Sequence, residues 1–227
     1  RPGKVDPKTL RVPVAFFFAA AAIYCVAAYG MGRFTRPMGL LMLGMFVAYM
    51  AANVWQMKNA PAEPEHEEEP MGIGKIVLLL VVGAALIALG ANLLVDNGTI
   101  IAQAMGVPES VIALTFVALG TSLPELVTAI TSLIKGHSDL SVGNVVGANV
   151  FNLVLVSGMS VTLAPFEIPQ SATLFGINSS LVLELPVMLL VMVLLTIPAL
   201  VRGKLSRVQG VALLCIYAAF CAVQFTM

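Results

Sequence analysis

Long apolar stretches alternate with short polar segments along the whole chain, and this alternation predicts its helices. Seven apolar runs approach the ~20 residues that a helix needs to cross about 30 Å of hydrocarbon. The pattern therefore predicts an all-α membrane protein with about seven transmembrane helices. The runs are Val12–Met31, Met38–Met57, Ile73–Val95, Pro108–Ile134, Leu140–Ala164, Asn178–Val201 and Leu205–Phe225.

The composition also indicates a membrane protein. Hydrophobic residues make up 59% of the chain and charged residues 11%, with a mean hydropathy of +0.97, whereas soluble domains carry about 25% charge. The net charge is zero and the basic residues are scattered, so we expect a lipid bilayer and no nucleic acid as partner. Cys25, Cys215 and Cys221 all fall in apolar runs, where free thiols are expected.

Residues 58–72 differ from the rest of the chain. They hold five glutamates and three prolines, a composition that cannot bury a core and stays solvated. We expect a flexible acidic linker between two spans in residues 1–57 and five spans in residues 73–227. A regulatory cation-binding role for the acidic run is the alternative.

The basic residues predict an orientation. If the N-terminus is cytoplasmic, ten of the 12 Lys and Arg residues lie inside and only Arg33 and Arg36 lie outside. The positive-inside rule therefore predicts a multi-pass protein of the cell membrane, with the N-terminus and the acidic linker in the cytoplasm. The loops 96–107 and 165–177 would then lie outside.

One carboxylate lies deep in an apolar run. Glu125 is near the middle of the fourth run, where a charge costs roughly 2.5–3.5 kcal/mol on insertion scales. Thr121 and Ser122 lie four and three residues before it, so that two hydroxyls share its face of a helix. Pro124 removes a backbone donor, which frees carbonyl groups around Ala118 for a ligand.

The fifth run adds the side-chain amides of Asn144, Asn149 and Asn152. Oxygen ligands without histidine or cysteine suit Na⁺ and Ca²⁺ and do not suit zinc or copper. Two other interpretations are hydrogen bonding between helices and a hydrolase with Ser122 as nucleophile. Since no histidine base lies in any span, we expect a cation site and not an enzyme.

Residues 106–158 closely resemble the second α-repeat of the calcium:cation antiporter superfamily, and above all its prokaryotic sodium/calcium exchangers. The resemblance rests on Gly120-Thr-Ser-Leu-Pro-Glu125 within Gly106 to Val127, and on Gly143-Asn-Val-Val-Gly-Ala-Asn-Val-Phe-Asn152. It implies a ten-helix fold of two inverted five-span halves. This chain would hold the last two spans of the first half and the whole second half.

The resemblance also implies ligands for transported Na⁺ and Ca²⁺, with no covalent cofactor. Glu125 would be the central carboxylate, Asn149 and Asn152 would come from the adjacent helix, and Asn144 is a secondary candidate. Glu184 is a further secondary candidate from the sequence, but a structural or capping role is expected for this residue. The remaining ligands would be Thr121, Ser122 and the carbonyl group of Ala118.

Three features depart from the expected pattern. Ala148 stands where many relatives have serine, and Asn152 stands where some have aspartate, which argues against potassium coupling. The chain starts at Arg1 without methionine and holds no second Gly-Thr-Ser-Leu-Pro-Glu segment. We therefore expect a segment of a longer or processed protein, whose N-terminal half, in the same or a separate chain, supplies the first repeat. The alternatives are a proton/calcium antiporter and a membrane subunit that does not transport.

Overall fold

The computed structural model describes residues 3–59, 72–107, 112, 118–136, 138–168, 173–174 and 176–224. It contains two compact units, residues 1–58 with 132–227 and residues 59–131. Most of the predicted acidic linker lies outside the described residues, and the division into domains at residues 58–72 stays a prediction.

Six continuous helical stretches are long and apolar enough to cross a membrane. A further helix, α5 (Ala118–Ile134), has 17 residues and covers the described part of the predicted fourth span. The prediction of an all-α membrane protein is therefore confirmed. The six stretches are Pro7–Met31, Arg36–Lys58, Ile73–Ala104, Ser141–Leu163, Ser180–Arg202 and Arg207–Gln224.

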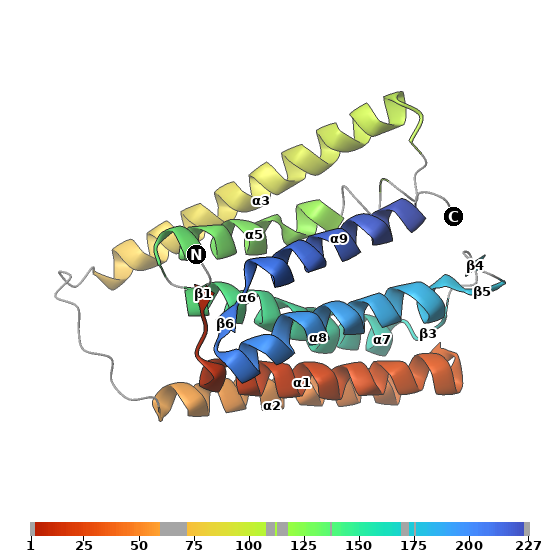
Figure 1. Cartoon of the computed structure of the whole chain (residues 1–227), viewed down its shortest axis with the longest axis horizontal. Helices are drawn as coiled ribbons and strands as arrows, with labels where there is room; N and C mark the ends of the chain where they lie inside the picture. The colour runs from red at the N-terminus through yellow and green to blue at the C-terminus, as the bar shows by residue number, and fades with distance from the viewer. Residues whose placement is uncertain are drawn as a thin grey trace. The chain divides into compact units, whose positions relative to one another are not determined.

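Several of these stretches contain a π-helical segment, written η, in series with α-helix (Figure 1). The larger unit is built from α1 (Pro7–Cys25), η1 (Val26–Met31), α2 (Arg36–Lys58), α6 (Ser138–Phe151), η3 (Asn152–Val156), α7 (Ser157–Leu163), η4 (Ser180–Glu184), α8 (Leu185–Arg202) and α9 (Arg207–Gln224). The smaller unit holds α3 (Ile73–Ala104) and most of α5.

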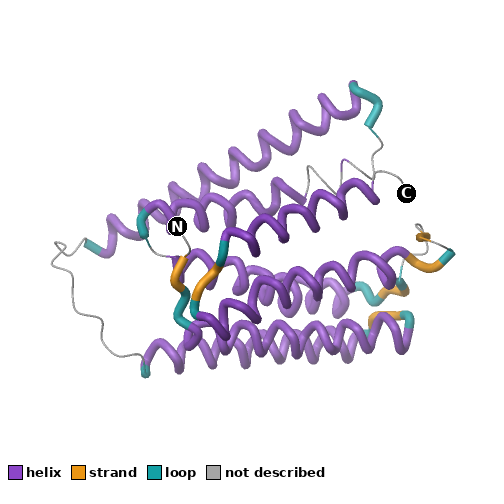
Figure 2. Tube along the Cα trace, in the orientation of Figure 1, coloured by secondary structure: helices purple, strands orange, loops and turns teal. Residues whose placement is uncertain are grey.

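Short strand pairs close the two ends of the larger unit (Figure 2). At one end β1 (Gly3–Lys4) pairs with β6 (Lys204–Leu205), and at the other β2 (Arg33–Phe34) pairs with β3 (Phe166–Glu167). A third pair joins β4 (Thr173–Leu174) to β5 (Ile177–Asn178). The N-terminus and the turn after α8 thus share one end of the unit, as the order of the predicted spans requires.

Helix α1 lies at the centre of the larger unit, where it contacts α2, α6 and α8. Asp6 starts this helix by accepting a hydrogen bond from the Lys8 backbone nitrogen at 2.9 Å, with Pro7 in the first turn. Its buried face then packs against valines of α6 and η3 and against α8. The core cluster includes Leu10, Val14, Phe17, Ala20, Ala21, Val146, Val150, Val154, Met192 and Ala199.

The closest helix contact in this unit joins α2 to α7. A Cβ atom at Gly39 would lie 2.7 Å from the Thr162 backbone nitrogen and 2.9 Å from the Gly158 carbonyl oxygen. Small residues allow helix backbones to approach closely in membranes. Gly143 of α6, in contrast, has no described neighbour within 4 Å of an added Cβ atom.

One expectation from the sequence was wrong in detail. Helix α3 continues from Val95 to Ala104 and ends before Gly106, whose φ is 77°, so the first part of the predicted outer loop is helical. No proline interrupts this stretch, and Asn97 donates to the Leu93 carbonyl oxygen at 2.6 Å. Tyr49 of α2 is 8% exposed and lies against Phe16, with ring centroids 5.4 Å apart.

Replacing Gly39 by alanine is expected to lower the stability of the protein by about 1–3 kcal/mol, because the new methyl group meets backbone atoms that cannot rotate away. Gly44→Ala is the matched control, since Gly44 lies on the same helix with open space around it among the described atoms. Thermal unfolding in detergent measures both. Equal unfolding temperatures for the two variants would contradict the close contact.

Candidate functional site

Helix α5 carries the candidate carboxylate. Glu125 is half-buried, and among the residues that the structure describes no donor reaches its Oε2 atom, which is shielded from solvent. Buried polar atoms in native proteins are nearly always paired, and an exception marks a site that an ion or water completes. The Oε2 atom of Glu125 is therefore the strongest sign of a cation ligand in this unit.

The hydroxyl groups on the same helix are accessible. Thr121 and Ser122 are exposed and lie one turn before Glu125, as the spacing predicted. Pro124 lies inside α5, and without its N–H the carbonyl group of Gly120 loses its usual helical donor. The helix nevertheless runs unbroken from Ala118, whose carbonyl group stays a predicted ligand.

Gly120 has a packing role that the sequence did not reveal. A Cβ atom at this position would overlap the side chain of Val95 and would lie 3.6 Å from the Ala91 carbonyl oxygen. Helix α5 therefore lies directly against α3 beside Thr121. The absence of a side chain at Gly120 sets how closely the hydroxyl-bearing turn approaches its neighbour.

The stretch from α6 to η3 carries the predicted amides. Asn149 donates from Nδ2 to the Val145 carbonyl oxygen at 2.8 Å, which leaves Oδ1 for another partner. Asn149 and Asn152 are both exposed, whereas Nδ2 of Asn144 is buried without a hydrogen-bond partner among the described residues. Asn149 and Asn152 therefore stay predicted oxygen ligands, and Asn144 carries an unsatisfied donor nearby in the chain.

A π-helical segment begins at Asn152, which sequence reasoning missed. The Asn152 carbonyl oxygen accepts from the Ser157 backbone nitrogen, five residues ahead, and from Ser157 Oγ at 3.1 Å. Such single-turn π segments are frequent at functional sites because they rotate the residues around them. The local signal for this π-helical segment in the sequence was Ser157, which lies five residues after Asn152 in an apolar run.

Glu184 lies apart from these residues in the chain and has a partner of its own. Its Oε2 atom accepts a hydrogen bond from Ser180 Oγ at 2.9 Å, and the Ser180 backbone nitrogen donates to Asn178 Oδ1 at 2.9 Å. These contacts hold the η4 turn before α8. They favour the structural role expected for Glu184 over a role in cation binding.

The described residues hold no group of three or more His, Cys, Asp and Glu side chains that could bind a metal. A cation here would be held by hydroxyl, amide and carbonyl oxygens around one carboxylate, which suits Na⁺ or Ca²⁺. Thr121, Ser122 and Glu125 share α5, and Asn149 and Asn152 share the α6–η3 stretch. These two sets belong to different units, so their convergence stays a prediction.

Comparison with known proteins gives the family. Residues 75–226 match the model of the sodium/calcium exchanger protein family. The chain belongs to this family. It is 34% identical over 200 residues to CaxA of Alkalimonas amylolytica, covering 85% of this chain and 60% of that protein. It is 33% identical over 154 residues to the sodium/calcium exchanger MaX1 of Methanosarcina acetivorans, covering 68% of this chain and 42% of that exchanger.

The exchanger fold extends over nearly the whole chain. Superposition on the sodium-calcium exchanger NCX_Mj soaked with Na⁺ and Sr²⁺ gives a TM-score of 0.73 at 27% identity, covering 98% of this chain and 68% of that one. The chain therefore spans about two thirds or less of each of these relatives. The resemblance inferred from the motifs of α5 and α6 is confirmed.

The contact at Gly120 gives a prediction for this exchanger-type helix pair. Gly120→Ala should lower the unfolding temperature, because the new methyl group overlaps the side chain of Val95, which is stiff about χ1. Val95→Ala in the same protein should restore most of the loss by making room. Thermal unfolding of both single variants and the double variant measures the coupling, and strictly additive effects would show that the two residues do not touch.

Proposed function

We propose that the whole protein is a sodium/calcium antiporter and that this chain supplies the second half of its ion site. The observation that carries the proposal is the Oε2 atom of Glu125, buried and unpartnered on the family motif of α5. A carboxylate at this depth needs a cation or a donor to offset its desolvation. The match of residues 75–226 to the sodium/calcium exchanger family supports transport as the use of this site.

The proposed ligands are all oxygen atoms. They come from Glu125, Thr121 and Ser122 on α5, from the carbonyl group of Ala118, and from Asn149 and Asn152 on the α6–η3 stretch. One carboxylate with neutral oxygens can hold Na⁺ as well as Ca²⁺, so that the two ions compete. Alternating exposure of the site would then let an inward sodium gradient expel calcium.

The proposal includes a first half of the ion site that these residues do not supply. The chain spans 60% of CaxA and 42% of MaX1, and α1 and α2 correspond to the last two spans of a first half. We propose that a preceding segment or a separate chain supplies the first α-repeat with its own carboxylate. A membrane subunit that does not transport is the alternative, and addition of a first repeat would leave it inactive.

The proposed orientation places the N-terminus and the acidic linker in the cytoplasm of a cell-membrane protein. It is supported by the pairing of β1 with β6 and by Gln56 Nε2, which donates to the Lys8 carbonyl oxygen at 3.0 Å. These contacts gather the basic ends of α1, α2 and α8 on one side of the larger unit. The positive-inside rule assigns that side to the cytoplasm.

Glu125→Gln should lower sodium-dependent calcium uptake at least tenfold in vesicles containing the whole protein. The change keeps the shape of the side chain and removes its charge, and interactions of a charged group contribute about 1.5–3 kcal/mol. Glu167→Gln, at an exposed acid in β3, is the control and should transport normally. Unchanged uptake by the Glu125 variant would refute its assignment.

The coupling ion can be tested separately. With Asn152 in place of the aspartate of some relatives, the site has one titratable group fewer, so we expect a sodium gradient alone to drive calcium uptake. A pH gradient alone, with sodium absent on both sides, should drive none. Uptake that follows the pH gradient would instead identify a proton/calcium antiporter, and uptake with neither gradient would exclude antiport.

A further inference from the structure

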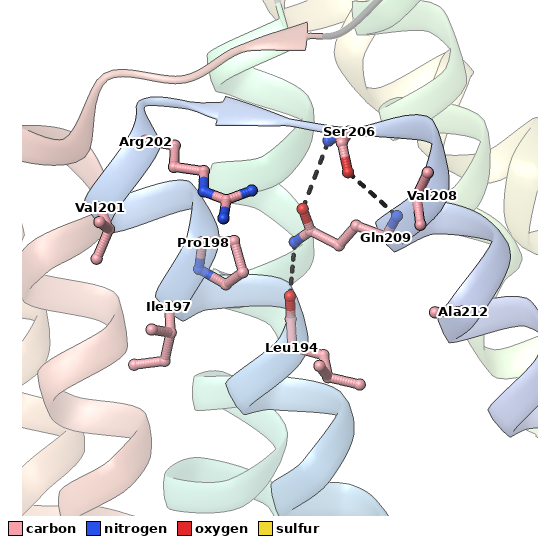
Figure 3. Close-up of a pocket in the computed structure, with 9 residues that line it drawn as sticks. All are labelled: Leu194, Ile197, Pro198, Val201, Arg202, Ser206, Val208, Gln209 and Ala212. Atoms are coloured by element: carbon pink, nitrogen blue, oxygen red, sulfur yellow. Dashed lines mark hydrogen bonds between the residues drawn. The ribbon is translucent and has the colours of Figure 1, made fainter.

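A groove of about 420 Å³ lies between α8 and α9, next to the turn that joins them (Figure 3). Its walls are mostly apolar and come from both helices, with Pro198 inside α8 and Arg202 at the end of that helix. The groove lies far along the chain from Glu125 and is not part of the proposed ion site. Its apolar walls are formed by Leu194, Ile197, Val201, Val208 and Ala212.

One side chain joins the two helices beside the groove. Pro198 has no N–H, so the Leu194 carbonyl oxygen lacks the donor that would come four residues later. Gln209 of α9 replaces it, donating from Nε2 to Leu194 at 2.6 Å and to Leu195 at 3.2 Å. This bond joins the first turn of α9 to α8 one turn before Pro198, as Figure 3 shows.

The polar atoms of Gln209 are already used. Its backbone nitrogen donates to Ser206 Oγ at 3.2 Å, and its Oε1 accepts from the Ser206 backbone nitrogen at 3.4 Å, the reciprocal arrangement of a capping box. The Arg202 guanidinium, in contrast, makes no hydrogen bond or ion pair with the described residues, and no acidic residue lines the groove. Arg202 is therefore the group left to bind a ligand.

The charge around the groove selects an anion. Arg202 lies in the last turn of α8 and is the one charged residue among those that line the groove. A guanidinium binds phosphate oxygens in pairs. Basic pockets between membrane helices, at the level where helices end, bind the headgroups of anionic lipids.

The apolar walls then select a lipid over a free anion. The groove continues from Arg202 along α8 and α9 to Leu194 and Ala212, toward the middle of both spans. Helix α9 has no buried residue, so an acyl chain can reach the groove from the bilayer. We propose that this groove binds an anionic phospholipid, with the phosphate on Arg202 and an acyl chain along the apolar walls.

The proposal depends on the membrane fold and not on the transport activity, so lipid binding can be measured directly. The whole protein, purified in detergent, is titrated with phosphatidylglycerol or phosphatidylcholine, and bound lipid is counted by native mass spectrometry. Phosphatidylglycerol should bind more tightly, and Arg202→Gln should weaken its binding about tenfold, as expected for loss of a charge-assisted contact. Arg207→Gln, an exposed neighbour outside the groove lining, should bind as the unaltered protein does.

Two more variants separate folding from binding. Arg202→Lys keeps the charge without the planar fork and should give intermediate affinity. Ala212→Phe fills the apolar wall and should weaken binding of both lipids. Variants are compared only at equal unfolding temperature without lipid. If Arg202→Gln has a lower unfolding temperature than the unaltered protein, the proposal is tested with Arg202→Lys and Ala212→Phe instead. Normal lipid binding by both of these variants would overturn the proposal.

The other occupants of the groove give different results. Equal weakening by Arg202→Gln and Arg207→Gln would show diffuse attraction to basic residues and overturn the proposal. Displacement of the lipid by excess inorganic phosphate would indicate a free-anion site, and loss of bound lipid on dimer formation would indicate a second copy on this face. Either result would also overturn it, whereas retention of the lipid in both cases supports it.

Discussion

A polar atom inside a bilayer has no water to bond with, and the structure depends on how such atoms find partners. Gln209 of α9 donates to the carbonyl oxygen that Pro198 leaves unpaired on α8, at 2.6 Å. Tyr29 of η1 donates to the Leu181 carbonyl oxygen of η4 at 2.5 Å. The first of these carbonyl groups lies four residues before a proline, and the second lies in a π-helical segment. In both cases a side chain from another helix donates to the carbonyl oxygen. These hydrogen bonds join helices of the larger unit in addition to the apolar contacts.

Glu125 is the exception that relates the structure to function. Its Oε2 atom is buried and has no donor in the described part of the chain, on a helix that already lacks one backbone donor at Pro124. The proposed function rests on this deficit, because an ion that satisfies the carboxylate in one state could leave it in another.

The placement of three candidate residues on α5 was predictable from local sequence. Thr121, Ser122 and Glu125 lie on one helix because their spacing matches a helical turn, and the motif around them identified the family that residues 75–226 match. The role of Gly120 was not predictable, because it depends on Val95 in a different helix. Nor was the π-helical turn at Asn152, which depends on a bond to Ser157 that competes with the ordinary helical pattern.

The sequence by itself determined the class of protein and the order of its spans, because the length of an apolar run is set by the thickness of the hydrocarbon. It also predicts the chemistry of the candidate site, through residue types at helical spacing. Only the tertiary structure decided which small residues touch, that Tyr49 is buried, that α3 extends to Ala104, and that Gln209 holds α9 against α8. These features depend on neighbours distant in sequence, and apolarity alone does not distinguish a side chain that faces lipid from one that faces another helix.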